Sequence, residues 1–324
     1  MSKRFFAGAI AALSLVGCAS APPSPPPTVD TDAIDRIFSN VPVLEDDAPA
    51  RLYTPAQAAS LERRDGYLVD RSTNAPSHNE RVRFLIIHYT GGDEVAAMRA
   101  LTGSNVSAHY LVTAVPGRYR DRPVVMQLVD EERRAWHAGV SRWGNRDNLN
   151  DTSIGIEIVN RGHYASPEGR VWAPYSSAQI ELVTRLARDI VNRYDIAPEN
   201  VLGHSDVSPG RKIDPGPFFP WQRLHEAGVG AWPEREAVVR YRRELSDAPL
   251  SAAGLQEALS VWGYAVPTSG TLDDRTRRVL RAFQSHFRAS DTDGEMDIET
   301  QAILLALVER YHGSGEATAL LRRR

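Results

Sequence analysis

The chain has 324 residues and a nearly balanced charge, with 38 Lys and Arg against 41 Asp and Glu and a formal net charge of −3. Charged residues are interspersed and form no basic stripe, which excludes nucleic acid as an expected partner. A single cysteine excludes an intrachain disulfide, and the length suits two domains better than one.

The first residues, 1–17, are expected to be a lipoprotein signal peptide. Lys3 and Arg4 precede an apolar run from Phe5 to Val16, which is too short for a stable membrane span. The run closes in Leu15-Val16-Gly17-Cys18, which resembles a bacterial lipobox. We therefore expect Cys18 to carry the lipid and to become residue one of the mature protein. The alternative is a buried hydrophobic helix with an incidental cysteine.

Residues 18–50 are expected to tether the folded part of the chain to a membrane surface. The segment contains Pro22-Pro23-Ser24-Pro25-Pro26-Pro27, and such proline-rich sequence is extended and semi-rigid. A disordered tail with no spacing role is the alternative.

Residues 51–235 are expected to form an α/β (α+β) domain with a mixed central β-sheet flanked by helices. The nearly continuous apolar run Arg83–His88 predicts a strand buried on both faces. Capping boxes beginning at Thr54 and Ser176 predict helix starts, and the second opens an amphipathic helix. Further strands are predicted at Tyr110–Ala114, Val124–Val129 and Ser153–Val159.

Residues 240–312 show a pattern of helices only, which predicts a small C-terminal three-helix domain. Three segments each place their apolar residues on one face, and turn signals at Ser269-Gly270 and Asp293-Gly294 separate them. The three faces consist of Leu255, Leu259 and Trp262; Leu280, Phe283 and Phe287; and Ile303, Leu304, Leu307 and Tyr311. Residues 313–324 are expected to be a C-terminal tail, in which Arg322-Arg323-Arg324 forms a solvated end.

The loop from His204 to Pro217 concentrates side chains that bind metals or stabilise charge. Lys212 is one of only two lysines in a chain that otherwise uses arginine, which indicates a need for a compact, titratable ammonium. His204 and Asp214 are metal-competent side chains on this proline- and glycine-stiffened loop. With His88, at the end of a buried strand, they make a three-ligand set typical of catalytic zinc, in which water takes the fourth position. Alone, His88 fits a hydrogen-bonded core residue equally well.

Glu157 lies in the strand Ser153–Val159, where alternation places three isoleucines on one face and Glu157 with Gly155 on the other. A carboxylate in so apolar a strand is costly unless it is paired or functional. The functional interpretation is a general base whose pKa burial has raised. The alternative is a glutamate paired with one of the many arginines.

Five sequence blocks match a known family in its order: Phe84–Thr90, Val106–Val112, Ala135–Gly139, Asn150–Glu157, and His204–Pro217 with Phe219–Trp221. They resemble the zinc-dependent N-acetylmuramoyl-L-alanine amidases, the family that includes phage T7 lysozyme and the peptidoglycan recognition proteins. Within it, the chain is most similar to the outer-membrane lipoprotein amidases of Gram-negative bacteria. The resemblance implies a catalytic domain over residues 51–235 that hydrolyses the amide between N-acetylmuramic acid and L-alanine of the stem peptide.

The resemblance also implies roles for individual residues. One Zn²⁺ per chain would be held by His88, His204 and Asp214. Glu157 would be the catalytic acid/base, and Lys212 the cation that stabilises the tetrahedral intermediate. Five more residues would border the substrate groove: His109, Tyr110, Trp136, His137 and Arg211. The alternative is that His109 and His137 only hydrogen-bond neighbouring backbone and that Trp136 is a core residue.

Residues 240–312 resemble the three-helix peptidoglycan-binding domain of many wall hydrolases; the alternative is a stabilising appendage without wall affinity. Peptidoglycan or muropeptides are thus the expected partners of a monomeric chain with a lipid anchor in the membrane. Ala19 rather than aspartate follows Cys18, which favours the outer membrane, facing the periplasm. Two other functions stay open: a non-catalytic peptidoglycan-binding protein, and a zinc peptidase that cuts within the stem peptide.

Overall fold

The central sheet is built around the most apolar run of the sequence. The structure, a computed structural model, describes residues 43–44, 52–73, 82–167 and 169–322. Eight strands form the sheet in the order β14-β4-β10-β5-β7-β3-β2, with β6 paired to β7 outside this path. Their bounds are β2 Leu61–Arg64, β3 Tyr67–Asp70, β4 Phe84–Tyr89, β5 Tyr110–Val112, β6 Gly117–Tyr119, β7 Arg122–Gln127, β10 Ser153–Ile158 and β14 Val201–Gly203.

The sheet is mixed, as the sequence predicted. Strands β14, β4, β10 and β5 run parallel to one another, and β3 runs parallel to β7. The pairs β5–β7, β2–β3 and β6–β7 are antiparallel. Four of these strands correspond to the predicted ones, although β5 is shorter than expected.

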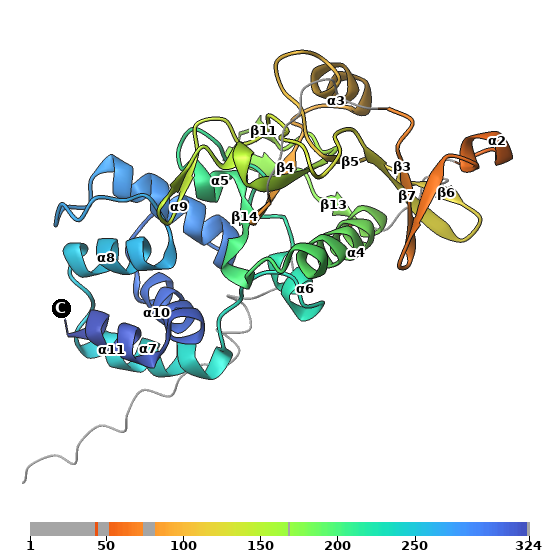
Figure 1. Cartoon of the computed structure of the whole chain (residues 1–324). Coiled ribbons are helices and arrows are strands. Elements are labelled where there is room, and N and C mark those ends of the chain that lie inside the picture. The colour runs from red at the N-terminus through yellow and green to blue at the C-terminus, as the bar shows by residue number, and fades with distance from the viewer. Residues whose placement is uncertain (1–42, 45–51, 74–81, 168, 323–324) are drawn as a thin grey trace, which may run out of the picture. The chain divides into compact units, whose positions relative to one another are not determined.

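One face of the sheet is covered by α4, Ser177–Tyr194 (Figure 1). The predicted capping box is present: the Ser176 side chain accepts from the Gln179 backbone, and the Gln179 side chain accepts from the Ser176 backbone. The buried apolar stripe of α4 packs with the isoleucines of β10, Ile154, Ile156 and Ile158. The other predicted capping box, at Thr54, begins only a single helical turn, α2 (Pro55–Ala58), which has no buried residue.

The other face of the sheet supports shorter elements. Helix α3 (Glu94–Leu101) buries Ala97 and Leu101 against Leu111 of β5. The remaining elements before residue 235, whichever side of the sheet they lie on, are β1 Val43–Leu44, β8 Arg142–Trp143, β9 Arg146–Asp147, η1 Leu149–Asp151, β11 His163–Ser166, β12 Gly169–Trp172, β13 Tyr175–Ser176, η2 Pro198–Asn200, α5 His204–Val207 and α6 Trp221–Glu226.

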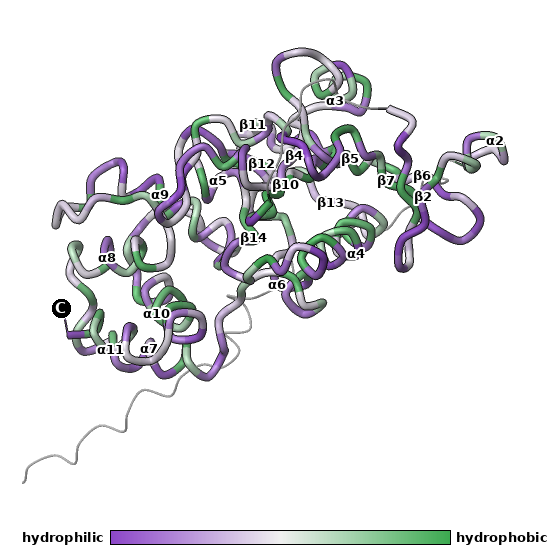
Figure 2. Tube along the Cα trace, viewed as in Figure 1, coloured by the Kyte–Doolittle hydropathy of each residue, from purple (hydrophilic) through white to green (hydrophobic). Residues whose placement is uncertain are grey.

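The described part of the chain after residue 234 contains five helices rather than three. They are α7 Arg235–Asp247, α8 Ala252–Trp262, α9 Asp274–Phe287, α10 Ile298–His312 and α11 Ser314–Leu321. The three predicted apolar faces belong to α8, α9 and α10, and Figure 2 shows the apolar character of α10. Helix α11 lies within residues 313–324, the segment that was expected to be a tail. This segment is helical because Ala317 and Leu320 pack into the same core as the other C-terminal helices.

The C-terminal helices share one hydrophobic core with the sheet. Phe84 and Ile86 of β4 and Leu202 of β14 belong to the same cluster of buried side chains as Leu255, Phe283 and the buried face of α10. The two regions therefore bury each other's apolar surface. All described residues lie within one compact unit, Thr31–Arg324.

Several expectations concern residues that the structure does not describe. The signal peptide, Cys18 and most of the segment 18–50 lie outside the described residues. Within that segment, Val43–Leu44 forms β1, which pairs in parallel with β13. Among the described residues, no helix combines the length and the apolar character needed to cross a membrane.

Candidate metal centre and active site

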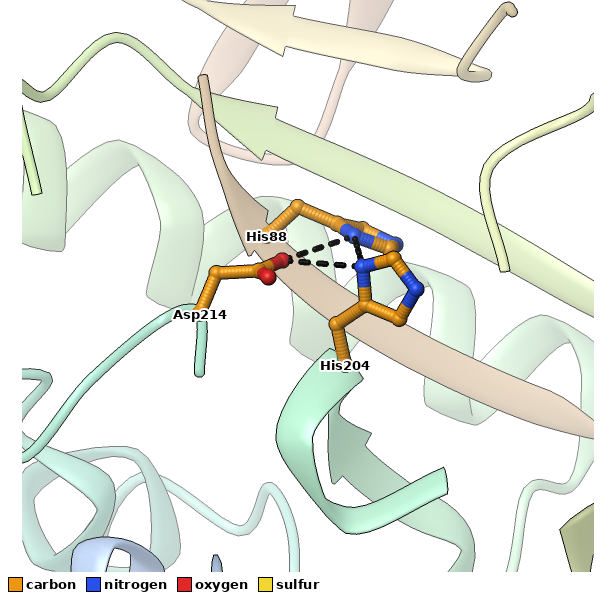
Figure 3. A group of neighbouring side chains, drawn as sticks. All are labelled: His88, His204 and Asp214. Atoms are coloured by element: carbon orange, nitrogen blue, oxygen red, sulfur yellow. Dashed lines mark hydrogen bonds and ion pairs between the residues drawn. The ribbon is translucent and has the colours of Figure 1, made fainter. Parts of the chain in front are cut away.

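Three side chains from separate elements converge on one point (Figure 3). His88 comes from β4, His204 from the first residue of α5, and Asp214 from the loop that follows. The His88 and His204 Nδ1 atoms lie 3.0 Å apart, and Asp214 Oδ2 lies 3.1 and 3.0 Å from them. All three side chains are buried. Metal bonds of about 2.0–2.1 Å in a tetrahedral site separate the donor atoms by roughly 3.3 Å, close to this spacing.

The hydrogen bonds of the two Nε2 atoms determine whether the Nδ1 atoms, which face the cluster, carry a proton or a lone pair. His204 Nε2 lies 3.1 Å from the carbonyl oxygen of Ala138. A carbonyl only accepts, so His204 Nε2 carries the proton and, in the neutral ring, Nδ1 is free to bind a cation. Burial and the neighbouring His204 lower the pKa of His88 to about 4, so that this ring is neutral at pH 7.

His88 is the first member of a chain of hydrogen bonds that leads away from the cluster. His88 Nε2 lies 3.0 Å from His137 Nδ1, and His137 Nε2 lies 3.2 Å from Ser153 Oγ. Ser153 Oγ donates to the carbonyl oxygen of Leu149 at 2.6 Å. With Nε2 protonated on both rings, every group in this chain has a donor or an acceptor, and His88 Nδ1 points at the cluster as a lone pair.

A glycine makes room for this chain. A Cβ atom on Gly155 of β10 would lie 2.5–2.8 Å from the ring of His137. Only a residue without a side chain fits beside the ring at this position of the strand.

The donor set fits a cation. In these tautomers, two imidazole lone pairs and a carboxylate oxygen face one another, and a positive ion between them removes their mutual repulsion. Two imidazoles and one carboxylate are a ligand set that zinc takes in catalytic sites. Within the described residues, no other group of three metal-binding side chains converges in this way.

Glu157 lies on the strand next to His88 and faces the same side of the sheet. It is opposite His88 in the register of β10 and β4. Its Oε2 atom is inaccessible to solvent and has no hydrogen-bond partner among the described residues. Burial and the nearby Asp214 charge raise its pKa to about 8, whereas Lys212 opposes the shift. An unpaired carboxyl group of this kind is poised to exchange a proton near neutral pH.

The loop that carries Lys212 is closed by backbone hydrogen bonds. The Ser205 N–H donates to the Asp214 carbonyl oxygen at 2.9 Å, which ties the two ends together. The Arg211 and Lys212 N–H groups both donate to the Ser208 carbonyl oxygen. No carboxylate in the described part of the chain pairs with the half-buried Lys212 ammonium, so it is available to an external negative charge.

A cavity of about 350 Å³ brings these groups together. Glu157, Lys212, His204 and Asp214 all line it. Of the five predicted substrate-groove residues, it is also lined by Trp136, His137 and Arg211. Trp136 is 37% exposed, with the Arg134 guanidinium 3.8 Å from its ring centre, so it is a surface residue and not a core residue. Arg211 donates to the carbonyl oxygens of Ala138 and Val140, which fixes the orientation of its guanidinium group.

The structure places His109 and Tyr110 elsewhere. Both are fully buried and neither lines this cavity. His109 Nδ1 accepts from the Gly155 N–H at 3.0 Å, and its Nε2 donates to the Arg133 carbonyl oxygen at 2.9 Å. Tyr110 donates to Glu131 on the side of the sheet that packs against α4. Their contacts hold strands in place.

The sequence analysis did not identify the α3 residues that line the cavity, nor the residue that attaches the loop from His204 to Pro217 to the C-terminal region. Ala97, Ala100 and Leu101 of α3 line the cavity, but small apolar residues on a short helix carry no functional signal. Asp206, two residues after His204, is buried and bonded to the C-terminal helices. Its position beside a candidate ligand was the only available hint.

The fold and the site together define a class. Two histidines and an aspartate that converge on one point, beside a cavity that a glutamate lines, are a set of side chains typical of hydrolases that use one metal ion.

The family follows from comparison with known proteins. The family described as N-acetylmuramoyl-L-alanine amidase matches residues 78–217, and the one described as a peptidoglycan binding domain matches residues 253–304. N-acetylmuramoyl-L-alanine amidase AmiD of Escherichia coli K12 is 47% identical over 249 residues, covering 76% of this chain and 90% of that protein. This chain therefore belongs to the N-acetylmuramoyl-L-alanine amidase family.

Solved structures support the same assignment. AmiD from E. coli, solved with the substrate anhydro-N-acetylmuramic acid-L-Ala-D-gamma-Glu-L-Lys, matches with a TM-score of 0.67 and 46% identity, covering 78% of this chain and 98% of that chain. AmpDh3 from Pseudomonas aeruginosa matches with a TM-score of 0.66 and 47% identity, over 74% and 96% of the two chains. The predicted family and fold are thus confirmed.

Proposed function

We propose that this protein is a zinc-dependent N-acetylmuramoyl-L-alanine amidase. It hydrolyses the amide bond between the lactyl group of N-acetylmuramic acid and the L-alanine of the stem peptide. The observation that carries the proposal is Glu157, which lines the same cavity as His204, Asp214 and Lys212 and whose Oε2 atom is inaccessible to solvent and has no hydrogen-bond partner among the described residues. Membership of the amidase family supplies the substrate class.

The metal would be held by His88, His204 and Asp214. When bound there, zinc acidifies water and polarises a carbonyl group. The tautomers set by Ala138 and His137 keep both Nδ1 lone pairs directed at the ion. The outer partners thereby orient the ligands before any substrate arrives.

Glu157 would move the proton of the reaction. Its carboxylate accepts a proton from the attacking water, whose oxygen forms the new bond to the lactyl carbonyl carbon. The same carboxyl group then gives that proton to the alanine nitrogen as the C–N bond breaks. The products are a lactyl carboxylic acid and a peptide with a free N-terminal L-alanine. A pKa raised by burial favours both transfers near neutral pH.

Lys212 would stabilise the negative charge that develops on the carbonyl oxygen. Lys212 lines the cavity, and its ammonium group has no carboxylate partner within the described residues. A cation placed in advance where charge develops needs no reorganisation during the reaction. Trp136, His137 and Arg211, which line the same cavity, would contact the muropeptide.

We also propose that the protein is a monomeric lipoprotein anchored through Cys18 in the outer membrane and facing the periplasm. The lipobox-like Leu15-Val16-Gly17-Cys18 and the proline-rich segment after it support this location. The match of residues 253–304 to a peptidoglycan binding domain supports a role for the C-terminal helices in contacting the wall.

Digestion of a soluble muropeptide tests the proposed reaction. The zinc-loaded protein is incubated with N-acetylmuramic acid carrying a tripeptide stem, and the products are analysed by mass spectrometry. We expect the free sugar acid and a tripeptide with N-terminal L-alanine. Cleavage inside the peptide would instead identify a peptidase, and bound but intact substrate would identify a non-catalytic binding protein.

A further inference from the structure

The loop that carries His204 and Asp214 is attached to the C-terminal helices through a buried carboxylate. Asp206 lies on α5, two residues after His204, and is 1% exposed. It accepts three hydrogen bonds: from the Gly203 N–H at 2.7 Å, from the Tyr264 hydroxyl at 2.5 Å and from His286 Nδ1 at 2.7 Å. Two of the three donors therefore come from the C-terminal region.

The ring of His286 is itself held in a fixed orientation. It stacks on Trp221 with centroids 3.8 Å apart and on Phe287 with centroids 4.0 Å apart. A carboxylate only accepts, so His286 Nδ1 carries a proton and donates it to Asp206. A buried carboxylate that loses one donor keeps its desolvation cost without the compensating bond, so this contact strongly favours one position of α5.

Helix α9 contacts the same loop at a second point. The side chain of Arg278 lies over Gly210, where a Cβ atom would come within 1.9 Å of Arg278 Cδ. Arg278 and His286 are eight positions apart and lie on one side of α9. The helix thus runs alongside the loop and touches it at Gly210 and, through Asp206, beside His204.

We propose that Asp206, Tyr264 and His286 are positioning residues for the metal centre. Through them, the C-terminal helices hold His204 and the loop up to Asp214 in the arrangement that lets both side chains bind one ion. This inference rests on the proposed zinc-dependent function. The C-terminal region would then affect the turnover of every substrate, including soluble muropeptides that are too small to contact the C-terminal helices. This role is separate from any binding of these helices to the wall.

Two substitutions at His286 separate the hydrogen bond from packing. In His286→Phe, the ring still stacks on Trp221 and Phe287, but the donor is lost. In His286→Asn, the stacking ring is lost, but an amide N–H is kept at the same number of bonds from Cα as Nδ1. We expect His286→Phe to lose zinc to a chelator about tenfold faster and to turn over a soluble muropeptide about tenfold more slowly, with little change in KM. His286→Asn should regain most of both properties.

Milder variants guard against a failure to fold. Tyr264→Phe removes only the hydroxyl that donates to Asp206, and we expect a smaller change in the same direction. Arg278→Ala removes the contact with Gly210, and its matched control is Arg275→Ala, an exposed arginine on the same helix without a described contact to the loop. Circular dichroism at the assay temperature verifies that each variant is folded.

The proposal is overturned if folded His286→Phe and Tyr264→Phe keep wild-type zinc retention. It is also overturned if folded His286→Phe keeps zinc as the wild type does while His286→Asn loses it, because the packing of the ring alone would then explain the effect. Zinc retention is measured without substrate, so it tests the positioning role even if the wild-type protein has no amidase activity. That last result would contradict the proposed function instead.

Discussion

Glu157 of β10 lies directly opposite His88 of β4 in the register of two parallel strands. Neighbouring strands are about 4.8 Å apart, so backbone hydrogen bonding fixes the distance between the candidate base and a candidate metal ligand. A slip of one residue would turn Glu157 toward α4 and leave Ile156 or Ile158 in its place. The geometry of this pair is therefore as rigid as the sheet.

Replacement of the candidate base should separate chemistry from metal binding. Glu157→Gln keeps the shape of the side chain but cannot accept a proton, so we expect kcat to fall by about 10²–10⁴. Zinc content, measured by atomic absorption, should stay at the wild-type level because His88, His204 and Asp214 are unchanged. Glu181→Gln, on an exposed position of α4, is the matched control. Wild-type turnover in Glu157→Gln would show that another group moves the proton.

A methyl group at Gly155 should damage the metal centre without touching a ligand. In Gly155→Ala, the Cβ atom would overlap the ring of His137, which must move and release His88 Nε2. We expect zinc affinity to fall by about 10- to 100-fold. Competition with a chelating dye measures this affinity.

The control for this substitution is Gly315→Ala in α11, where no atom lies near the new Cβ. Unchanged zinc affinity in folded Gly155→Ala would mean that the His137 hydrogen bond does not support His88.

The raised pKa of Glu157 predicts a pH-dependent stability of the metal-free protein. The pKa rises from 4.5 to about 8 on folding, so the folded protein binds this proton more tightly than the unfolded chain. The resulting stability is fully present below pH 4.5 and is lost as the pH rises to about 8. Between these values, the wild-type protein should lose up to about 1.4 kcal/mol per pH unit relative to Glu157→Gln.

Urea unfolding with a chelator present, from pH 5 to pH 9, measures this difference. Parallel stability curves for the two proteins would contradict a protonated Glu157. Zinc loading should reduce the slope, because a nearby positive charge favours the carboxylate.

The shared core predicts that the sheet and the C-terminal helices unfold together. Phe283 of α9 is buried in the same cluster as Phe84 and Ile86 of β4. Phe283→Ala should cost about 3–5 kcal/mol and shift a single calorimetric transition to lower temperature. Val140→Ala, at an 81% exposed position, should change stability by less than about 0.5 kcal/mol. Two separate transitions, only one of them shifted, would contradict a common core.

The parts of the site that local sequence patterns determine were predictable. Alternation in β10 places Glu157 on the face opposite the isoleucines, and an apolar run ending in histidine places His88 at the end of β4. The same local patterns predicted α4 and its cap. The residue types of the His204–Pro217 loop together with His88 indicated the zinc ligand set, and family resemblance supplied the role of Lys212. Both stay predictions until metal and activity are measured.

Other features depend on contacts between distant segments. The pattern of β5 does not reveal which of its faces packs on α4, and this choice directs Tyr110 to Glu131 rather than to the cavity. Nothing in the sequence links Asp206 to His286, 80 residues away. Strands β2 and β14 were missed because four and three residues are too few to show a period.

The scarcity of lysine makes the cavity chemically addressable. Of the two lysines in the chain, Lys3 and Lys212, only Lys212 lies in the described part, and it lines the cavity. A reagent selective for primary ε-amines therefore has a single target among the described residues. A ligand bound in the cavity should protect this amine from covalent labelling. The extent of labelling therefore reports whether the cavity is occupied, without any substitution in the protein.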